Sequence, residues 1–443
     1  MKWEKEIALN SEYDILVAGG GPSGCAAAIA AARLGAKTLL LEASGSLGGM
    51  GTIGLVPAWC PFSDKEKIIY KGIAEEVFDR AKQGVKHHKK EDTDWVGIDS
   101  EALKRVYDEM VIEAGCDVLF QSSLCDAKRI ANKIEYIVVS NKAGLTAYTG
   151  KVYIDCTGDA DLVAWSGLEF EYGGSQGEVQ PATHCFQLSN VDTYSYLNGP
   201  VLHSNNKKSP IYDILEDDKY DLIIDSHMCN NLVGPNSVGF NAGHIENVNP
   251  TDPTSVSGAL IRGRKLANQF HDSLKEYCST AFASSFLSAT APVMGIRESR
   301  RIVGEYRLTI DDYIARHSFQ DEIGRCCYYA DVHQSLPQSK DSDNAGTNKF
   351  LQLGRYNRGE SYGIPFRSLI PKGIDNLLVA GKIISCDRGV LGSVRVMPPA
   401  LVTGQAAGTA AAMASMNDYG IHKVPVDELQ AVLEKNNVNL HGL

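Results

Sequence analysis

Apolar runs and an Ala-rich segment alternate in the first 42 residues. The run 13–18 ends in glycines, Ala-rich sequence follows through Leu34, and a second apolar run covers 37–42. This order predicts a strand, a tight turn, a helix and a second strand. Crossovers between parallel strands are almost always right-handed, so residues 13–42 are expected to form one βαβ unit that opens a parallel sheet.

Three β-rich runs follow between residues 115 and 161. They cover 117–120, 133–139 and 151–155 and are separated by polar turns. They predict a β-meander whose chain returns to the parallel sheet at 152–154.

The middle of the chain is more polar and less regular. One long helix is well indicated, starting near Pro253 with an apolar stripe that reaches Tyr277. Thr309 and Asp312 have the spacing of a helix cap. We therefore interpret residues 167–354 as an inserted substrate domain of mixed α+β structure.

The C-terminal part of the chain again shows a buried strand and an Ala-rich helix, as the N-terminal part does. A buried strand is predicted at 377–380 and an Ala/Gly-rich helix at 399–416. The predicted fold is therefore α/β, with a discontinuous Rossmann-like dinucleotide-binding domain made of residues 1–166 and 355–443.

Composition excludes several classes of protein. A formal net charge of −11 argues against a nucleic-acid partner. The charged start of the chain lacks a secretory signal, and no apolar run reaches the roughly 20 residues of a membrane span, so a cytoplasmic location without membrane contact is expected. Eleven cysteines include no Cys-x-x-Cys pair and no Cys/His group with zinc spacing, so no metal site is predicted.

The first turn carries a dinucleotide-binding fingerprint. Gly19, Gly21 and Gly24 match G-x-G-x-x-G between a strand and a helix, and Pro22 and Ser23 open that helix. The helix N-terminus offers free N–H groups and a partial positive charge to phosphates. Glu42 ends the second strand about 20 residues further on, where a carboxylate can accept hydrogen bonds from a ribose diol.

A second glycine patch at 48–52 lets backbone lie against an extended ligand. Together with the run 155–161, the stretch 381–408 and the segment 295–301, the N-terminal run resembles the FAD-dependent oxidoreductases of glutathione-reductase-like topology. The resemblance covers roughly half of the chain. It implies non-covalent FAD, with the diphosphate on the glycine fingerprint and the adenosine ribose on Glu42.

The same resemblance implies further FAD-binding residues along the chain. It places the backbone of Leu124 at the adenine, and Gly381, Asp387, Arg395 and Met397 around the ribityl chain and ring. Hydroxylases of related topology have a compact Gly-Asp-Ala run, whereas five residues separate Gly381 from Asp387 here. The remaining residues of the expected site are Ala43, Gly48, Gly49, Met50, Gly51, Thr52, Thr157, Gly158 and Asp159.

No second fingerprint for NAD(P)H and no dithiol motif accompany the first, which favours a direct two-electron exchange between FAD and a small substrate. Arg297 and Arg300 are candidates to orient an anionic substrate, and the alternative, which we favour slightly, is an Arg–Glu network that ties the domains together. His184 is a candidate acid or base, with a structural histidine as the alternative.

Two other functions stay open at this stage. One is a flavin monooxygenase, and the other is a non-catalytic flavoprotein that senses redox state. The sequence does not identify the substrate, the physiological electron donor or acceptor, the direction of reaction or the oligomeric state.

Overall fold

A parallel sheet forms the centre of the molecule. The computed structural model describes residues 4–334, 353 and 355–440 of the 443-residue chain. Within these residues the sheet has five strands in the order β17-β8-β2-β3-β4, and every neighbouring pair is parallel. The strands are β2 (Ile15–Ala18), β3 (Thr38–Leu41), β4 (Asp117–Leu119), β8 (Val152–Asp155) and β17 (Leu377–Val379). The predicted α/β fold with an opening βαβ unit is confirmed.

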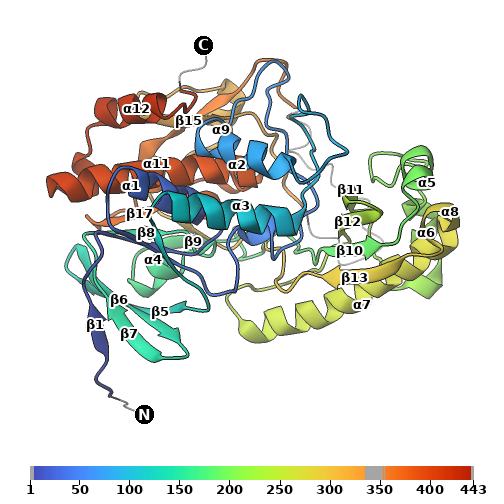
Figure 1. Ribbon diagram of the computed structural model, residues 1–443, viewed down its shortest axis with the longest axis horizontal. Helices are drawn as coiled ribbons and strands as arrows, with labels where there is room; N and C mark the ends of the chain where they lie inside the picture. Colours follow the sequence, from blue (N-terminus) through green and yellow to red (C-terminus); the bar gives the residue numbers. More distant parts are fainter. Residues whose placement is uncertain (1–3, 335–352, 354, 441–443) are drawn as a thin grey trace.

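Two helices from opposite ends of the sequence pack together against this sheet. They are α1 (Pro22–Arg33) and α11 (Met397–Asn417), and they lie side by side in Figure 1. A Cβ atom at Gly404 or at Gly408 would lie 2.1 Å from a backbone oxygen of α1, so the helices can approach this closely only because both positions lack a side chain.

A separate four-stranded sheet carries the meander. Its order is β1-β7-β6-β5, with bounds β1 (Ala8–Asn10), β5 (Ser123–Ile130), β6 (Lys133–Asn141) and β7 (Gly144–Tyr148). The interpretation of the run 117–120 as part of the meander is wrong, because β4 pairs in parallel with β3. The helix α3 (Ser100–Glu113) leads directly into β4, which makes β4 a crossover strand of the central sheet.

The middle of the chain builds a second hydrophobic core. Its buried residues run from Ala182 to Met294, around an antiparallel sheet in the order β11-β12-β10-β13. The predicted long helix is confirmed as α7 (Pro253–Tyr277). Figure 1 shows this region at the opposite end of the view from the meander. Its other elements are β10 (Phe186–Ser189), β11 (Met228–Gly234), β12 (Ser237–Ala242), β13 (Phe286–Thr290), α5 (Thr193–Asn198), α6 (Ile211–Leu215) and α8 (Ser279–Phe282).

Most buried apolar residues from Ile302 onward belong to the first core. The cap of Thr309 and Asp312 is confirmed as a reciprocal capping box at the start of α9 (Ile310–Ala315). The predicted boundary at residue 354 lies outside the described residues, and the division into domains stays a prediction. The remaining elements are α2 (Ile73–Lys82), α4 (Asp161–Trp165), β9 (Phe170–Tyr172), β14 (Arg300–Ile302), β15 (Glu322–Cys326), β16 (Tyr362–Pro365), α10 (Arg388–Val394) and α12 (Val426–Lys435).

All eleven cysteines are free thiols. In the part of the chain that the structure describes, no helix has both the length and the apolar character needed to cross a membrane.

Candidate functional site

The glycine fingerprint forms a turn with one open side. Gly19 has φ +101°, and a Cβ atom at Gly24 would lie 1.7 Å from the carbonyl oxygen of Gly19. A Cβ atom at Gly21, in contrast, would meet no described atom within 4 Å. Gly21 is also the N-cap of α1, and no side chain among the described residues caps that helix end. The first turn of α1 therefore presents amides to open space, as a phosphate site requires.

Glu42 is held beside this turn before any ligand binds. Its carboxylate accepts hydrogen bonds from the backbone N–H of Gly20 (2.8 Å) and of Ser44 (2.6 Å). Its carbonyl oxygen accepts one from Ser122 N (3.0 Å), two residues before Leu124. Glu42 and the start of β5 are therefore neighbours, which is the arrangement expected for a ribose and an adenine.

The second glycine patch packs on the first. Gly48 N donates to Gly20 O (2.8 Å), and a Cβ atom at Gly49 would lie 3.1 Å from Gly21 Cα. A Cβ atom at Gly51 would lie 3.1 Å from the sulfur of Met397. The patch thus contacts both the turn expected at the diphosphate and Met397, which is expected near the ribityl chain and ring. Other members of the patch are Met50, which is half-buried, Thr52, which is buried, and the exposed Ala43 on the loop before it.

The C-terminal segment closes over the same turn. Gly381 has φ +83°, its N–H donates to Thr403 Oγ1 (3.0 Å), and a Cβ atom there would lie 2.7 Å from Ser23 Oγ. Asp159 accepts a hydrogen bond from Lys382 Nζ (2.9 Å), so the element formed by Thr157, Gly158 and Asp159 lies beside Gly381.

Asp155 holds this element in place by hydrogen bonds. Its fully buried carboxylate accepts hydrogen bonds from Thr157 N (3.0 Å), Thr157 Oγ1 (2.7 Å) and Val163 N (3.0 Å). Burial raises the pKa of Asp155 to about 6.

Both carboxylate oxygens of Asp387 already accept hydrogen bonds from backbone N–H groups of the protein. One carboxylate oxygen accepts from Val390 N (2.9 Å), as the N-cap of α10, and the other accepts from Ile310 N (2.7 Å). Its role toward a ligand stays a prediction. The N-terminus of α11, which follows Val396, has no side-chain cap from the described residues, and Pro398 and Pro399 in its first turn have no N–H to donate.

Arg300 and Arg301 lie in ion-pair networks. Arg300 donates to Asp161 (2.8 Å) and to Asp159 O (3.0 Å). The buried Arg301 donates to the buried carboxylate of Glu298 (2.8 Å), which also accepts from Arg388 Nε (3.1 Å). These contacts support the alternative in which this arginine group joins parts of the protein.

His184 is placed inside the second core. Its Nε2 is 2.6 Å from Ala291 O, and its ring fills the space that the missing side chain of Gly263 leaves on α7. These buried surroundings match the alternative of a structural histidine, and a role of His184 as acid or base stays a prediction.

Arg297 belongs to a different group, which sequence reasoning missed. We call it the junction cluster, because its members come from the second core, from the segment after β15 and from the turn before α11. The cluster could not be predicted from the sequence, because most of its residues are far apart in the chain and no two of its histidines belong to one local motif. The members are His227, His244, Arg297, Asp331, His333 and Arg395.

Hydrogen bonds tie the cluster together. Arg297 donates to Pro181 O and Thr183 Oγ1 (both 2.7 Å), and its other terminal nitrogen lies 3.2 Å from His227 Nε2. Arg395 donates to Asp331 O (2.7 Å) and lies 3.2 Å from its carboxylate. The buried Nε of Arg395 has no hydrogen-bond partner among the described residues. An unpartnered buried donor is costly, so this atom points to a ligand.

Burial and neighbouring cations lower the pKa of two histidines of the cluster, His227 and His333. Burial, with the positive charge of Arg297, lowers the pKa of His333 to about 3, despite an opposing effect of Asp331. Burial and the charge of Arg395 lower the pKa of Arg297 to about 10. Despite its own burial, Asp331 keeps a carboxyl pKa far below its usual range because His333 and both arginines stabilise its charge.

The cluster adjoins the predicted ring end of the cofactor. Arg395 is two residues before Met397, whose sulfur contacts the glycine patch at Gly51. A Cβ atom at Gly392 in α10 would lie 2.8 Å from Asp331 N. The turn between α10 and α11 therefore touches both the glycine patch and the cluster.

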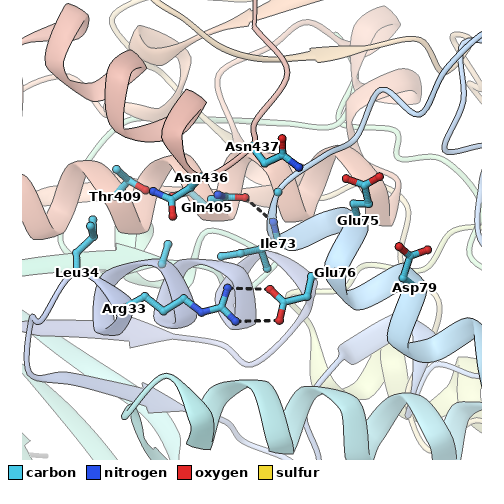
Figure 2. Close-up of a pocket in the computed structure, with 12 residues that line it drawn as sticks. Arg33, Leu34, Ile73, Glu75, Glu76, Asp79, Gln405, Thr409, Asn436 and Asn437 are labelled. Carbon is cyan, nitrogen blue, oxygen red and sulfur yellow. Dashed lines mark hydrogen bonds and ion pairs between the residues drawn. The ribbon is translucent and has the colours of Figure 1, made fainter.

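A surface pocket of about 360 Å³ lies elsewhere, at the opposite end of α1 from the glycine turn. Figure 2 shows the paired Arg33 and Glu76 (2.8 Å) in it, together with Gln405, whose side-chain oxygen accepts from Ile73 N. None of the residues predicted for the cofactor or for catalysis lines this pocket.

The geometry at Glu42 gives a first prediction. We expect Glu42→Ala to weaken cofactor affinity by about 1–3 kcal/mol, because a charged hydrogen-bond acceptor is lost. The change should leave the fold intact, since Glu42 is only partly buried. Titration of the cofactor-free protein measures the affinity, and thermal melting is the control. Unchanged affinity would contradict the placement of the ribose at Glu42.

A family model described as FAD dependent oxidoreductase matches residues 14–433. The mitochondrial dihydrolipoyl dehydrogenase of Schizosaccharomyces pombe is 31% identical over 130 residues, which cover 29% of this chain and 22% of that protein. The thiamine thiazole synthase of Methanococcus aeolicus is 33% identical over 163 residues, which cover 35% of this chain and 58% of that protein.

These matches span less than two thirds of the curated relatives. Among solved structures, a geranylgeranyl bacteriochlorophyll reductase-like protein from Thermoplasma acidophilum aligns with 97% of this chain and 84% of its own, with 13% identity and a TM-score of 0.47.

Proposed function

The chain belongs to the family of FAD-dependent oxidoreductases, and from this premise we propose that it exchanges two electrons, as a hydride, between bound FAD and a small organic substrate. FAD accepts or donates the hydride at its ring, and the protein's task is to place the substrate against that ring. The open glycine turn, the carboxylate of Glu42 beside it and the uncapped N-terminus of α1 support binding of FAD at this place.

The observation that carries the proposal is the position of the junction cluster. It gathers two arginines, three histidines and a carboxylate beside the turn that precedes α11. Titratable groups with strongly shifted pKa values gather at functional sites more often than elsewhere. We propose that this cluster is the substrate site, with Arg297 and Arg395 recognising an anionic group.

An anaerobic screen tests the function. The FAD-loaded protein is mixed with small hydroxy, amino and carboxylic acids, and bleaching of the flavin spectrum is followed. A parallel screen of oxidants follows reoxidation of the reduced protein. We expect reduction by a small anionic metabolite. Rapid oxygen consumption coupled to hydroxylation would support a monooxygenase, and a flavin that no small molecule reaches would support a redox sensor.

Arg297 and Arg300 offer a matched pair of substitutions. Arg→Lys keeps the charge but loses the planar fork. We expect Arg297→Lys to lower the rate of flavin reduction by roughly 10-fold to 100-fold, because one bidentate contact corresponds to about 1.5–3 kcal/mol.

Arg300→Lys should instead lower the melting temperature and leave flavin reduction nearly unchanged, because the side chain of Arg300 donates to Asp159 and Asp161 and lies over the ring of Phe170. Stopped-flow reduction with the metabolite found in the screen measures both variants. If Arg297→Lys reduces the flavin as fast as the unchanged protein, Arg297 does not orient the substrate.

A further inference from the structure

The pocket at the C-terminal end of α1 is a cavity that the proposed function does not use. Its volume of about 360 Å³ lies in the usual range of ligand pockets. Its walls come from the end of α1, the start of α2, the middle of α11 and the turn after α12. Four segments that are far apart in the sequence therefore build it. We call it the Gln405 pocket, after its most buried polar side chain.

Gln405 presents an N–H group without a partner to this pocket. The residue is 2% exposed, and its Oε1 accepts a hydrogen bond from Ile73 N (2.8 Å), as Figure 2 shows. This bond fixes the orientation of the amide, because a backbone N–H can only donate.

The other atom of the amide, Nε2, donates to no described residue. It is also absent from the unpartnered side-chain atoms that are closed off from solvent, so it opens to the pocket that Gln405 lines. A donor in this position calls for a ligand that carries an oxygen acceptor.

Two carboxylates on α2 charge the rim of the pocket. Glu75 and Asp79 are four residues apart, so their side chains lie on one face of the helix. Glu75 forms no hydrogen bond or ion pair with the described residues, and Asp79, 58% exposed, has only Lys82 at 3.8 Å. Like charges at this spacing repel each other, and a cation between them would offset the repulsion.

Arg33 does not turn the pocket into a site for anions. Its two terminal nitrogens donate to the two carboxylate oxygens of Glu76 (2.8 and 3.0 Å), the pair seen in Figure 2. Arg80 also donates to Glu76 (2.8 Å). Among the described residues that line the pocket, Arg33 is the only cation, and it faces three carboxylates in the same lining. The pocket therefore favours a positively charged ligand.

We propose that the Gln405 pocket binds a small hydroxylated amine, with its ammonium group at Glu75 and Asp79 and one of its oxygens accepting from Gln405 Nε2. This inference does not rest on the proposed function, because no residue predicted for FAD or for catalysis lines the pocket. It is a second ligand site, separate from the substrate site proposed above.

Other small ligands match the lining less well. An amino acid would bring its own carboxylate to the acidic rim. A neutral sugar would leave the charges of Glu75 and Asp79 without a counter-charge. A divalent cation would leave the N–H of Gln405 unpaired, since a metal ion accepts no hydrogen bond.

Three ring-shaped probes of similar size test the ligand chemistry. Glucosamine carries an ammonium group and hydroxyls, glucose carries hydroxyls only, and cyclohexylamine carries the ammonium group only. Calorimetry or saturation-transfer NMR measures their binding to the FAD-loaded protein at low salt. We expect glucosamine to bind about tenfold or more tightly than either of the others, because each lacks one of the two contacts.

Three outcomes of this comparison would overturn the proposal. Glucose that binds as tightly as glucosamine would show that the carboxylates do not act, and cyclohexylamine that does so would show the same for Gln405. The third is stoichiometric binding of Mg²⁺ that depends on Glu75, which would identify a metal site.

Substitutions locate the bound glucosamine. Glu75→Gln and Asp79→Asn should each weaken its binding by about tenfold, because each removes one charge from the rim. Glu109→Gln is the matched control, since it removes an exposed carboxylate from the neighbouring helix α3, outside the pocket. All three variants should keep FAD and the melting temperature, because none of these side chains is buried. Undiminished binding in both pocket variants, or an equal loss in Glu109→Gln, would refute the site.

Discussion

Gly24→Val should yield protein that no longer retains FAD. A Cβ atom at this position would lie 1.7 Å from the carbonyl oxygen of Gly19 and 3.2 Å from Cys156 Cβ. The turn must therefore move, and the amides at the start of α1 move with it. We expect affinity to fall by more than about hundredfold, on the order of 3 kcal/mol. The visible absorbance of the purified protein, and the flavin released by acid, measure the loss.

Two other glycines separate loss of the ligand from loss of the fold. Gly21→Ala should melt like the unchanged protein, because its methyl group meets no described atom within 4 Å, yet it should bind FAD more weakly, since that open space is where we place the diphosphate. Gly258→Ala, on the exposed side of α7, has equal space and should leave FAD binding unchanged, while the melting temperature should stay the same or rise because Ala favours a helix over Gly by about 1 kcal/mol. Full flavin content in both Gly24→Val and Gly21→Ala would refute the site.

Glu298→Ala should cost about 3–5 kcal/mol of unfolding free energy. The side chain of Glu298 is 0% exposed and accepts hydrogen bonds from Gln180 N (3.0 Å), Arg301 (2.8 Å) and Arg388 (3.1 Å). Its removal leaves the charge of Arg301, 3% exposed, without its closest counter-charge, and leaves a buried N–H without an acceptor. Denaturant unfolding of the FAD-loaded protein measures the change.

Glu178→Ala is the matched control, because Glu178 pairs with the same Arg388 at 2.9 Å but is 46% exposed. Exposed pairs contribute about 0–1 kcal/mol, so this variant should be nearly neutral. Equal losses in the two variants would mean that burial of the Glu298 carboxylate is not what matters.

Much of the fold could be predicted because its signals are local. The turn at Gly19 to Gly24, the long helix after Pro253 and the cap of Thr309 and Asp312 each depend on residues close together in sequence. The placement of β4 failed because strand-like residues show that a strand exists, whereas its partner depends on the preceding helix, α3.

The substrate site could be predicted only in part for the same reason. Arg297 was recognisable as a conspicuous charge, but His244 and His333 have no local pattern, and their rings meet only when β12 and the segment after β15 come together. Arg297 and Arg300 are three residues apart and look alike in sequence. The structure separates them, since one donates to Thr183 within the cluster and the other to Asp161.

The pairing of β8 with β17, and of α1 with α11, has a consequence for synthesis on the ribosome. The strands β2 and β3 and the glycine turn emerge long before Gly381 and Met397, which close over that turn. At about 5–20 residues per second, the interval between residues 155 and 397 takes on the order of tens of seconds. Throughout that time one edge of β8 lacks its neighbour and the cofactor lacks the far side of its site. Cofactor loading is therefore expected after translation, and a stop codon at residue 380 should give a colourless, aggregation-prone product although every residue of the fingerprint is present.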